Sequence, residues 1–358
     1  WMAGSQYVYS FGKCIFMPAD LTAGIEFNQD KLEDNMWGYH RTVDQKVNIG
    51  SAFFQNEWKN EHWGFLIGGR LDKHNLIDHV IFSPRANLRY NPTENINLRF
   101  SYSSGFRAPQ AFDEDLHVEN VGGNVAMVEL ADNLKEERSQ SLSVSADIYH
   151  RFGAFQVNFL VEGFYTKLSD VFALTDGEIV DGILTRTRYN APGARVMGLT
   201  LEGKMAYLTK FQLQAGITLQ QSHYSEPHVW NKEAPAVKKM MRTPNTYGYF
   251  TATYTPIKPL SIALSGTYTG SMLVPHEPVP GFLEKPITVN TKDFFDIGLK
   301  AAYDFKLYKS MNLQVNAGVQ NIFNAYQNDF DKGADRDSGY IYGPSLPRSF
   351  FAGVKISY

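Results

Sequence analysis

The feature that most constrains this chain is a long series of segments in which apolar and polar residues alternate one by one. In residues 95–103 the even-numbered positions hold Ile, Leu, Phe and Tyr, and the odd-numbered positions are polar. The same period of two returns in residues 211–220, 311–320 and 346–358. A period of two is the pattern of a β-strand with one apolar and one polar face. The sequence therefore predicts an all-β chain.

About fifteen such segments follow one another, and most of them have ten residues or more. We predict strands at residues 3–12, 20–29, 46–58, 61–73, 79–91, 94–104, 136–152, 154–168, 194–208, 210–223, 244–255, 258–271, 293–307, 310–325 and 346–358. Strands of globular proteins usually have about five or six residues. A tilted strand that crosses a bilayer needs about 9–11 residues. The strand length therefore favours a membrane protein over a soluble sandwich.

The connections between these segments alternate between short and long. The short links fall at residues 59–61, 90–94, 151–154, 207–210, 255–258 and 305–310, and the long ones at 30–45, 72–78, 105–135, 168–195, 221–242, 271–292 and 325–345. Transmembrane β-barrels have short periplasmic turns and long extracellular loops. In outer-membrane barrels a final strand that ends on an aromatic residue, as this chain does at Tyr358, closes the barrel on the periplasmic side. Counting back from Tyr358 places every long loop outside the cell.

Composition excludes several other classes. The 358 residues carry a net charge of −3 and no basic run, so the chain has no nucleic-acid footprint. Its single cysteine, Cys14, rules out an internal disulfide framework and a cysteine-based zinc site. No stretch of about 18 apolar residues predicts a transmembrane helix. The aromatic content of 14% would supply the girdles of a membrane barrel.

Four short motifs stand at the ends of predicted strands. They read Phe-Arg-Ala-Pro at 106–109, Asn-Leu-Lys-Glu-Glu-Arg-Ser at 133–139, Asn-Ile-Phe-Asn at 321–324 and Pro-Arg-Ser-Phe at 347–350. In this order and at these strand ends they resemble the boxes of the TonB-dependent outer-membrane receptors. The second motif departs from the family pattern, because it lacks both of the prolines found there.

The resemblance implies a transmembrane antiparallel β-barrel of 22 strands, of which about 15 lie in this chain. Residues 1–358 would form the C-terminal portion of that barrel, and an N-terminal plug domain, a TonB-contacting segment and the first strands would precede them. The function implied is active import across the outer membrane of a Gram-negative bacterium, powered by the TonB–ExbB–ExbD complex. No covalent chemistry is expected, so the chain is not predicted to be an enzyme.

The resemblance leaves the ligand open. A ferric siderophore or a related iron chelate is expected, and haem or cobalamin uptake is the alternative within the family. A surface lipoprotein could be a further partner beside the outer-membrane lipid. Because single-chain bacterial barrels close with an even number of strands, a passive porin of sixteen strands also stays open.

The candidate ligand-binding residues lie in the long loops and share aromatic, imidazole, thioether or cationic side chains. They are Arg107, His117, His223, Tyr224, His228, Trp230, Met240, Met241 and His276. Such residues bind flat chelates or metal centres, and they also serve as packing between loops. Arg107 is expected to anchor the base of its loop. His117 lies between the first two boxes, where haem receptors of the family place a histidine.

Two loops are rich in carboxylates. Asp113, Glu114, Asp115 and Glu119 are a candidate Ca²⁺ site, since hard cations prefer clustered carboxylates. Their spacing matches no EF-hand, and a solvated acidic loop is the alternative. No other cofactor is predicted. The aspartates at 329, 331, 335 and 337 are expected to lie on a solvated surface loop.

Overall fold

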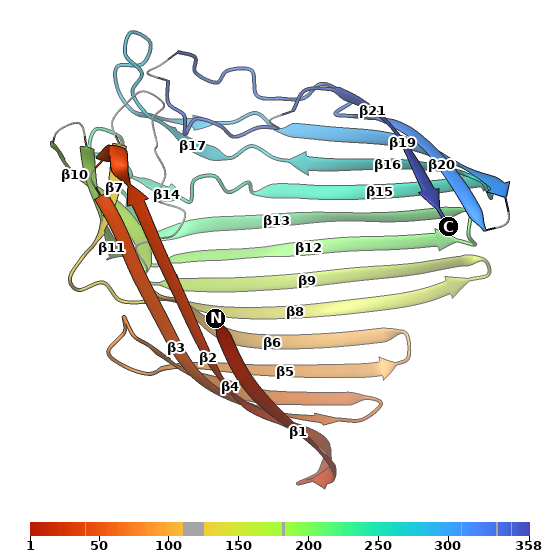
Figure 1. Ribbon diagram of the computed structural model, residues 1–358. Coiled ribbons are helices and arrows are strands. Elements are labelled where there is room, and N and C mark those ends of the chain that lie inside the picture. Colours follow the sequence, from red (N-terminus) through yellow and green to blue (C-terminus); the bar gives the residue numbers. More distant parts are fainter. Residues whose placement is uncertain (40, 110–124, 181–182, 309, 334–335, 345) are drawn as a thin grey trace.

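One continuous antiparallel sheet dominates the computed structural model (Figure 1). The structure describes residues 1–358 except 40, 110–124, 181–182, 309, 334–335 and 345. The main path of the sheet consists of β1 (Met2–Cys14), β2 (Met17–Met36), β3 (Arg41–Lys59), β4 (Trp63–His74), β5 (Ile81–Thr93), β6 (Ile96–Arg107), β8 (Glu137–Phe152), β9 (Phe155–Ser169), β12 (Ala194–Tyr207), β13 (Phe211–His228), β15 (Thr246–Ile257), β16 (Leu260–Thr269), β19 (Phe294–Tyr308), β20 (Met311–Gln320) and β21 (Ser349–Ser357). The short strand β14 (Val237–Lys239) pairs with β13 beside this path.

Each predicted strand has a counterpart in the structure, but the strand predicted at 310–325 ends at Gln320, where Asn321 takes a positive φ of 51°. The other corrections concern the links. The link predicted at 30–45 is not a loop, because β2 and β3 stay paired as far as Met36 and Arg41. A turn of 3-10 helix, η1 (Trp37–Tyr39), caps this ribbon. The residues on both strands of the ribbon are mostly polar, so the alternation that marks a strand is lost there.

Four long links contain strands that the sequence did not predict, and one of these is β14 in the link predicted at 221–242. β7 (Val125–Leu130), β10 (Val171–Val180) and β11 (Ile183–Ala191) form a separate three-stranded sheet in the order β10-β11-β7. β17 (Leu273–His276) and β18 (Ile287–Asn290) form a hairpin. In the part of the chain that the structure describes, no helix has the length and apolar character needed to cross a bilayer.

The main sheet has an apolar face and a polar face. Leu199 and Leu219 lie opposite each other on β12 and β13, and Leu219 is 47% exposed. On the other face, the hydroxyls of Thr200 and Thr218 lie 3.0 Å apart, and Thr218 is 7% exposed. In a membrane barrel the apolar face contacts lipid and the polar face lines the interior. We call the face that carries Leu199 the outer face and the face that carries Thr218 the inner face.

The two ends of the sheet also differ. Short links join the strands at one end, and the long links gather at the other, toward the left of Figure 1. We call these the turn end and the loop end. Aromatic pairs line the turn end, including Trp63 with Tyr90 at 4.2 Å and Phe155 with Tyr207 at 4.6 Å. Such a row matches the aromatic girdle at a membrane interface.

Aromatic rings cover glycines on neighbouring strands at several positions. The directly opposed pairs are Phe53 with Gly24, Phe164 with Gly198, Tyr249 with Gly216, Phe250 with Gly266 and Phe351 with Gly318. The ring occupies the space that a side chain at the glycine would need. These pairs fix the register of the strands, because a slip of one residue would move each ring to the opposite face.

Gly198→Ala is expected to lower the free energy of unfolding by about 1–3 kcal/mol, the usual cost of overpacking. A Cβ at Gly198 would lie 2.5 Å from the Leu219 carbonyl oxygen and 2.7 Å from Phe164 Cζ. Gly203 of the same strand is the matched control, because no heavy atom lies within 4 Å of a Cβ placed there. Denaturant titration of both variants in lipid vesicles measures the difference, and equal losses would contradict the packing argument.

The sheet is open in the described chain. β1 pairs with β2 alone and β21 pairs with β20 alone, so each has one edge without a strand partner among the described residues. Open strand edges carry unpaired backbone groups, which are costly in lipid.

Candidate ligand-binding site

The loop end contains two groups of packed loops. The first, here the N-side loop unit, comprises the described residues of 75–80, 108–136 and 170–193. Its centre is Phe172 of β10, whose ring lies 5.5 Å from the Arg107 guanidinium carbon and 5.7 Å from that of Arg188. The Phe172 amide donates a 3.0 Å hydrogen bond to Glu137. Arg107, predicted to anchor its loop, thus contacts the base of a neighbouring loop.

His79 connects the β4–β5 loop to the start of β8. Its Nδ1 lies 2.9 Å from Asp78 Oδ1, and its Nε2 lies 3.1 Å from Glu136 Oε1. Arg138 Nη2 lies 2.7 Å from the same oxygen of Glu136. Hydrogen bonds to the Asp78 and Glu136 carboxylates raise the pKa of His79 above 6.5. Burial opposes ionisation of Glu136, but hydrogen bonds, including those from Arg138 and His79, lower its pKa below 4.5.

The His79 contact should therefore depend on pH. Because the folded-state pKa is raised, its contribution to stability is fully present below about pH 6.5 and is lost as pH rises through the folded-state value. We expect backbone amides of residues 75–80 to exchange several-fold faster at pH 8.5 than at pH 6, after correction for intrinsic exchange rates. His79→Gln should abolish this difference, whereas His62→Gln at the turn end should keep it. A difference that persists in His79→Gln would refute the assignment.

The second group, here the C-side loop unit, comprises the described residues of 229–245, 270–293 and 321–348. Its apolar core is Met272, Val274 and Tyr340, against which Val289 and Tyr342 pack. These residues come from the β17–β18 hairpin and from the last loop. The C-side loop unit therefore has a small hydrophobic core of its own beyond the end of the main sheet.

A polar cluster lies beside this core. His276 Nε2 lies 2.9 Å from Asp331 Oδ2, and the His276 ring stacks on Tyr340 at 3.8 Å with an interplanar angle of 5°. The Tyr342 hydroxyl donates to Asp329, 2.6 Å from either carboxylate oxygen. Burial and the Asp329 carboxylate raise the pKa of Tyr342 far above its usual value. The prediction that this loop is solvated is wrong for Asp331, whose side chain is 4% exposed because it pairs with His276. Asp335 lies outside the described residues.

Further hydrogen bonds join the three loops of this unit. Arg242 donates to the carbonyl oxygens of Gly339 and Ile341, the latter at 3.0 Å. Asn231 Nδ2 donates to Glu277 at 2.9 Å. The Glu277 amide donates to Asp337 at 2.8 Å. The three loops are therefore held together as one unit.

The structure brings some of the predicted ligand-binding residues together. The rings of Tyr224 and His228 are 4.8 Å apart at the end of β13. The Trp230 indole nitrogen follows them and is buried with no hydrogen-bond partner in the described chain. His223 lies opposite Lys239 of β14, and by strand alternation its position belongs to the outer face.

For Met240 and Met241 the structure gives backbone contacts, and several other candidates lie outside the described residues. The Met240 amide donates to the Ser222 carbonyl, and the Met241 carbonyl accepts from Thr243. His276 belongs to the C-side loop unit. His117 and the four candidate Ca²⁺ ligands, Asp113, Glu114, Asp115 and Glu119, lie outside the described residues. Among the residues that are described, no group of three or more His, Cys, Asp or Glu side chains is placed to hold a metal ion.

Two features of the loop end were missed at the sequence level. The Asp329–Tyr342 contact joins residues of one loop, but nothing in their spacing shows that the loop folds back on itself. The pairing of Glu136 with His79 joins residues 57 positions apart. Only a contact map could have revealed it, because each residue alone is typical of a solvated loop.

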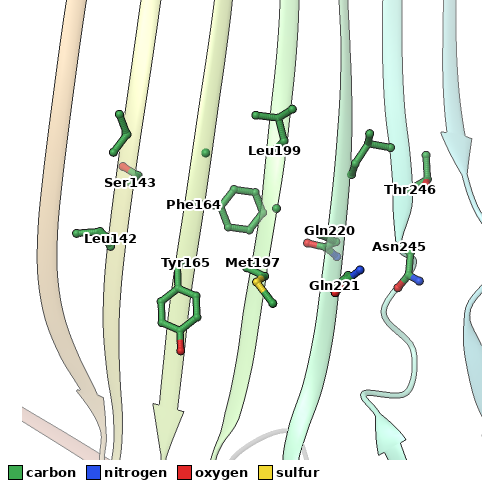
Figure 2. A pocket seen from close by; sticks show the side chains of 14 residues that line it. Leu142, Ser143, Phe164, Tyr165, Met197, Leu199, Gln220, Gln221, Asn245 and Thr246 are labelled. Atoms are coloured by element: carbon green, nitrogen blue, oxygen red, sulfur yellow. The ribbon is translucent and has the colours of Figure 1, made fainter.

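The large hollow in Figure 2 lies elsewhere, over β8, β9, β12 and β13. It has a volume of about 820 Å³, and Leu142, Tyr165, Met197 and Leu199 line it. These side chains occupy outer-face positions, because they share register rows with Leu219 and Gln221. An apolar hollow on the outer face does not suit a polar ligand, so the loop end is the candidate ligand-binding site.

Three comparisons bear on the family. Residues 3–322 match the family model described as TonB dependent receptor-like, beta-barrel. No curated protein sequence matches the chain. Solved structures of siderophore, ferric enterobactin and ferric-catecholate receptors share the fold over 99% of the chain.

Three of these solved structures illustrate the likeness. The siderophore receptor PirA from Acinetobacter baumannii has 17% identity and a TM-score of 0.69, with 54% of its length covered. A variant of the ferric enterobactin receptor PfeA from Pseudomonas aeruginosa, in complex with enterobactin, has 18% identity and a TM-score of 0.70, with 53% covered. The ferric-catecholate import receptor Fiu from E. coli K12 has 16% identity and a TM-score of 0.65, with 54% covered. The chain thus spans about half the length of the receptors it resembles.

Proposed function

The chain belongs to the TonB-dependent receptor β-barrel family, and we propose that the complete protein imports a ferric siderophore across the outer membrane of a Gram-negative bacterium. The single observation that carries this proposal is the family match over residues 3–322. The sorting of long loops to one end and short turns to the other supports the orientation in the membrane.

We further propose that residues 1–358 are the C-terminal portion of a 22-stranded barrel. The open edges of β1 and β21 support this, because in lipid both need further strands. A preceding plug domain would fill the interior, and the TonB–ExbB–ExbD complex would supply energy through a segment of that domain. The intact mass of the detergent-extracted protein tests the arrangement, since a mass of 40.5 kDa would contradict it.

Ligand recognition is assigned to the loop end. Tyr224, His228 and Trp230 are the proposed contacts, because the rings of Tyr224 and His228 meet at the loop end of β13 and the Trp230 indole N–H has no described acceptor. Arg107 and His276 are proposed as positioning residues, since both side chains make contacts between loops. A Ca²⁺ site at Asp113, Glu114, Asp115 and Glu119 stays a prediction that calcium titration of the purified protein can test.

Uptake of radioactive iron tests the function. The full-length protein would be expressed in a Gram-negative strain that lacks its own siderophore receptors, and ferric enterobactin, a ferric hydroxamate, haemin and cobalamin would be offered in turn. We expect energy-dependent uptake of one ferric siderophore, abolished when TonB is deleted. Uptake of haemin or cobalamin alone would favour the alternative ligands. Uptake that survives TonB deletion, together with steady ion conductance in planar bilayers, would favour a passive pore.

A further inference from the structure

A row of basic side chains crosses the outer face near the loop end. Lys167 of β9 lies opposite Arg195 of β12, which lies opposite His223 of β13, which in turn lies opposite Lys239 of β14. Lys167, Arg195 and His223 lie on the outer face, because each is an even number of residues from an outer-face residue of its own strand, namely Tyr165, Met197 or Leu219. Lys239 lies on the same face because it is paired with His223. The four residues are far apart in the sequence, so only the register of the sheet reveals the row.

The row lacks anionic partners in the described structure. No described ion pair or hydrogen bond involves the side chains of Lys167, Arg195, His223 or Lys239. The carboxylates of Asp170 and Glu226 lie three residues along the strands from Lys167 and His223, and neither forms an ion pair with the row. Like charges directly opposite each other on neighbouring strands are destabilising. An anion from outside the chain would remove this repulsion.

The row lies at the level expected for lipid headgroups. Arg195 is twelve residues from Tyr207, which belongs to the aromatic row at the turn end. At about 3.4 Å per residue and a tilt of about 40°, the two lie roughly 30 Å apart along the membrane normal. The hydrocarbon core of a bilayer is about 30 Å thick. If Tyr207 marks one interface, Arg195 marks the other, which is the extracellular one.

The apolar hollow of Figure 2 begins next to the row, on its turn-end side. Tyr165 and Met197 are two residues from Lys167 and Arg195 toward the turn end, and Gly163 and Leu199 are four residues away. The hollow has free space at Gly163, because no heavy atom lies within 4 Å of a Cβ placed on that residue. The hollow therefore continues from the basic row into the part of the outer face that contacts hydrocarbon.

We propose that this face binds an anionic, phosphate-bearing lipid of the outer leaflet. The phosphates would contact Lys167, Arg195 and Lys239, and an acyl chain would lie in the hollow at Gly163. Two features favour this lipid. The positive row complements the charge of the phosphates, and the apolar hollow beside it lies at the depth of the hydrocarbon core, where an acyl chain would lie. The proposal rests on the proposed membrane placement of the barrel but not on the identity of the imported ligand.

Native mass spectrometry of the full-length protein in detergent tests the headgroup contact. The probes are diphosphoryl lipid A, phosphatidylcholine and inorganic phosphate. We expect diphosphoryl lipid A to bind and K167Q/R195Q/K239Q to weaken its binding at least tenfold. The matched control is K300Q/K306Q/K355Q, which removes three positive charges from inner-face positions and should bind the lipid as the parent does.

A pair of glycine variants tests the acyl contact. Gly163 and Gly203 both occupy outer-face positions with open space above them, but Gly203 lies eight residues from Arg195 along β12. Gly163→Phe should fill the hollow and weaken lipid A binding several-fold, whereas Gly203→Phe should leave it unchanged. Thermal unfolding without lipid confirms that both variants fold. If neither folds, binding of lipid A to Gly163→Leu is measured instead.

Several results would overturn the proposal. Equal binding of diphosphoryl lipid A to the parent protein and to K167Q/R195Q/K239Q would remove the headgroup contact. Binding of inorganic phosphate with no preference for the lipid would reduce the row to a simple anion site. Lipid binding can succeed where siderophore uptake fails, so the two proposals fail separately. Extraction of the full-length protein without detergent would instead refute the membrane placement on which both depend.

Discussion

Arg70→Met is expected to lower the free energy of unfolding by about 3 kcal/mol. Arg70 Nε lies 2.8 Å from Asp72 Oδ1, and the Asp72 side chain is only 3% exposed. Arg70 Nη2 lies 3.1 Å from Glu26 and donates a 2.7 Å hydrogen bond to Ser51. Ser51 donates to Asp72 at 2.6 Å. Removing the guanidinium would leave a buried carboxylate with one hydroxyl donor and no cation.

A double-mutant cycle shows whether the loss has this cause. Asp72→Asn removes the buried charge, so the further loss on changing Arg70 to Met should be much smaller in that background. Arg85→Met is the matched control, because Arg85 occupies an inner-face position on the next strand and makes no ion pair with a described residue. Urea titrations of the complete protein in lipid vesicles measure all the variants. Equal losses for Arg70→Met and Arg85→Met would contradict the role of Asp72.

The strands could be predicted from the sequence because a membrane barrel imposes a clear alternation of apolar and polar residues on each long strand. Each strand has a lipid side and an interior side, so the period of two persists over ten or more residues, as in 211–220. The β2–β3 ribbon was missed because it continues beyond Asn28 and Ile49, where the neighbouring strands β1 and β4 stop pairing. With most of its residues polar on both faces, the ribbon carries no alternation.

The loop end could not be predicted to the same extent because its contacts are non-local. β11 pairs in parallel with β7, although Ile183 and Val125 are 58 residues apart. His276 was a candidate ligand-binding residue because of its side chain alone, and the structure places it against Asp331 and Tyr340. The burial of these polar groups follows from how three loops pack, and no local pattern records that.

Asp331→Ala should release the C-side loop unit without unfolding the barrel. His276 is 5% exposed and Asp331 accepts from the Asp337 amide as well as contacting His276, so the change leaves the buried His276 ring and the half-buried Asp337 amide without this partner. We expect protease cleavage within residues 321–348 to become about 10–100-fold faster, since opening of this loop would cost about 1.4–2.8 kcal/mol less. The sheet itself should keep its denaturant midpoint, because the loop lies beyond the end of β20.

Lys332→Ala is the matched control for this prediction. Lys332 is the next residue in the same loop, is exposed and makes no described ion pair. The affinity for whichever chelate supports uptake should fall in Asp331→Ala and not in Lys332→Ala, because a ligand that contacts ordered loops must then pay for ordering them. Unchanged cleavage in Asp331→Ala would mean that the His276–Asp331 pair does not hold the three loops together. Faster cleavage with unchanged affinity would place ligand binding outside the C-side loop unit, at the N-side loops or the inner face.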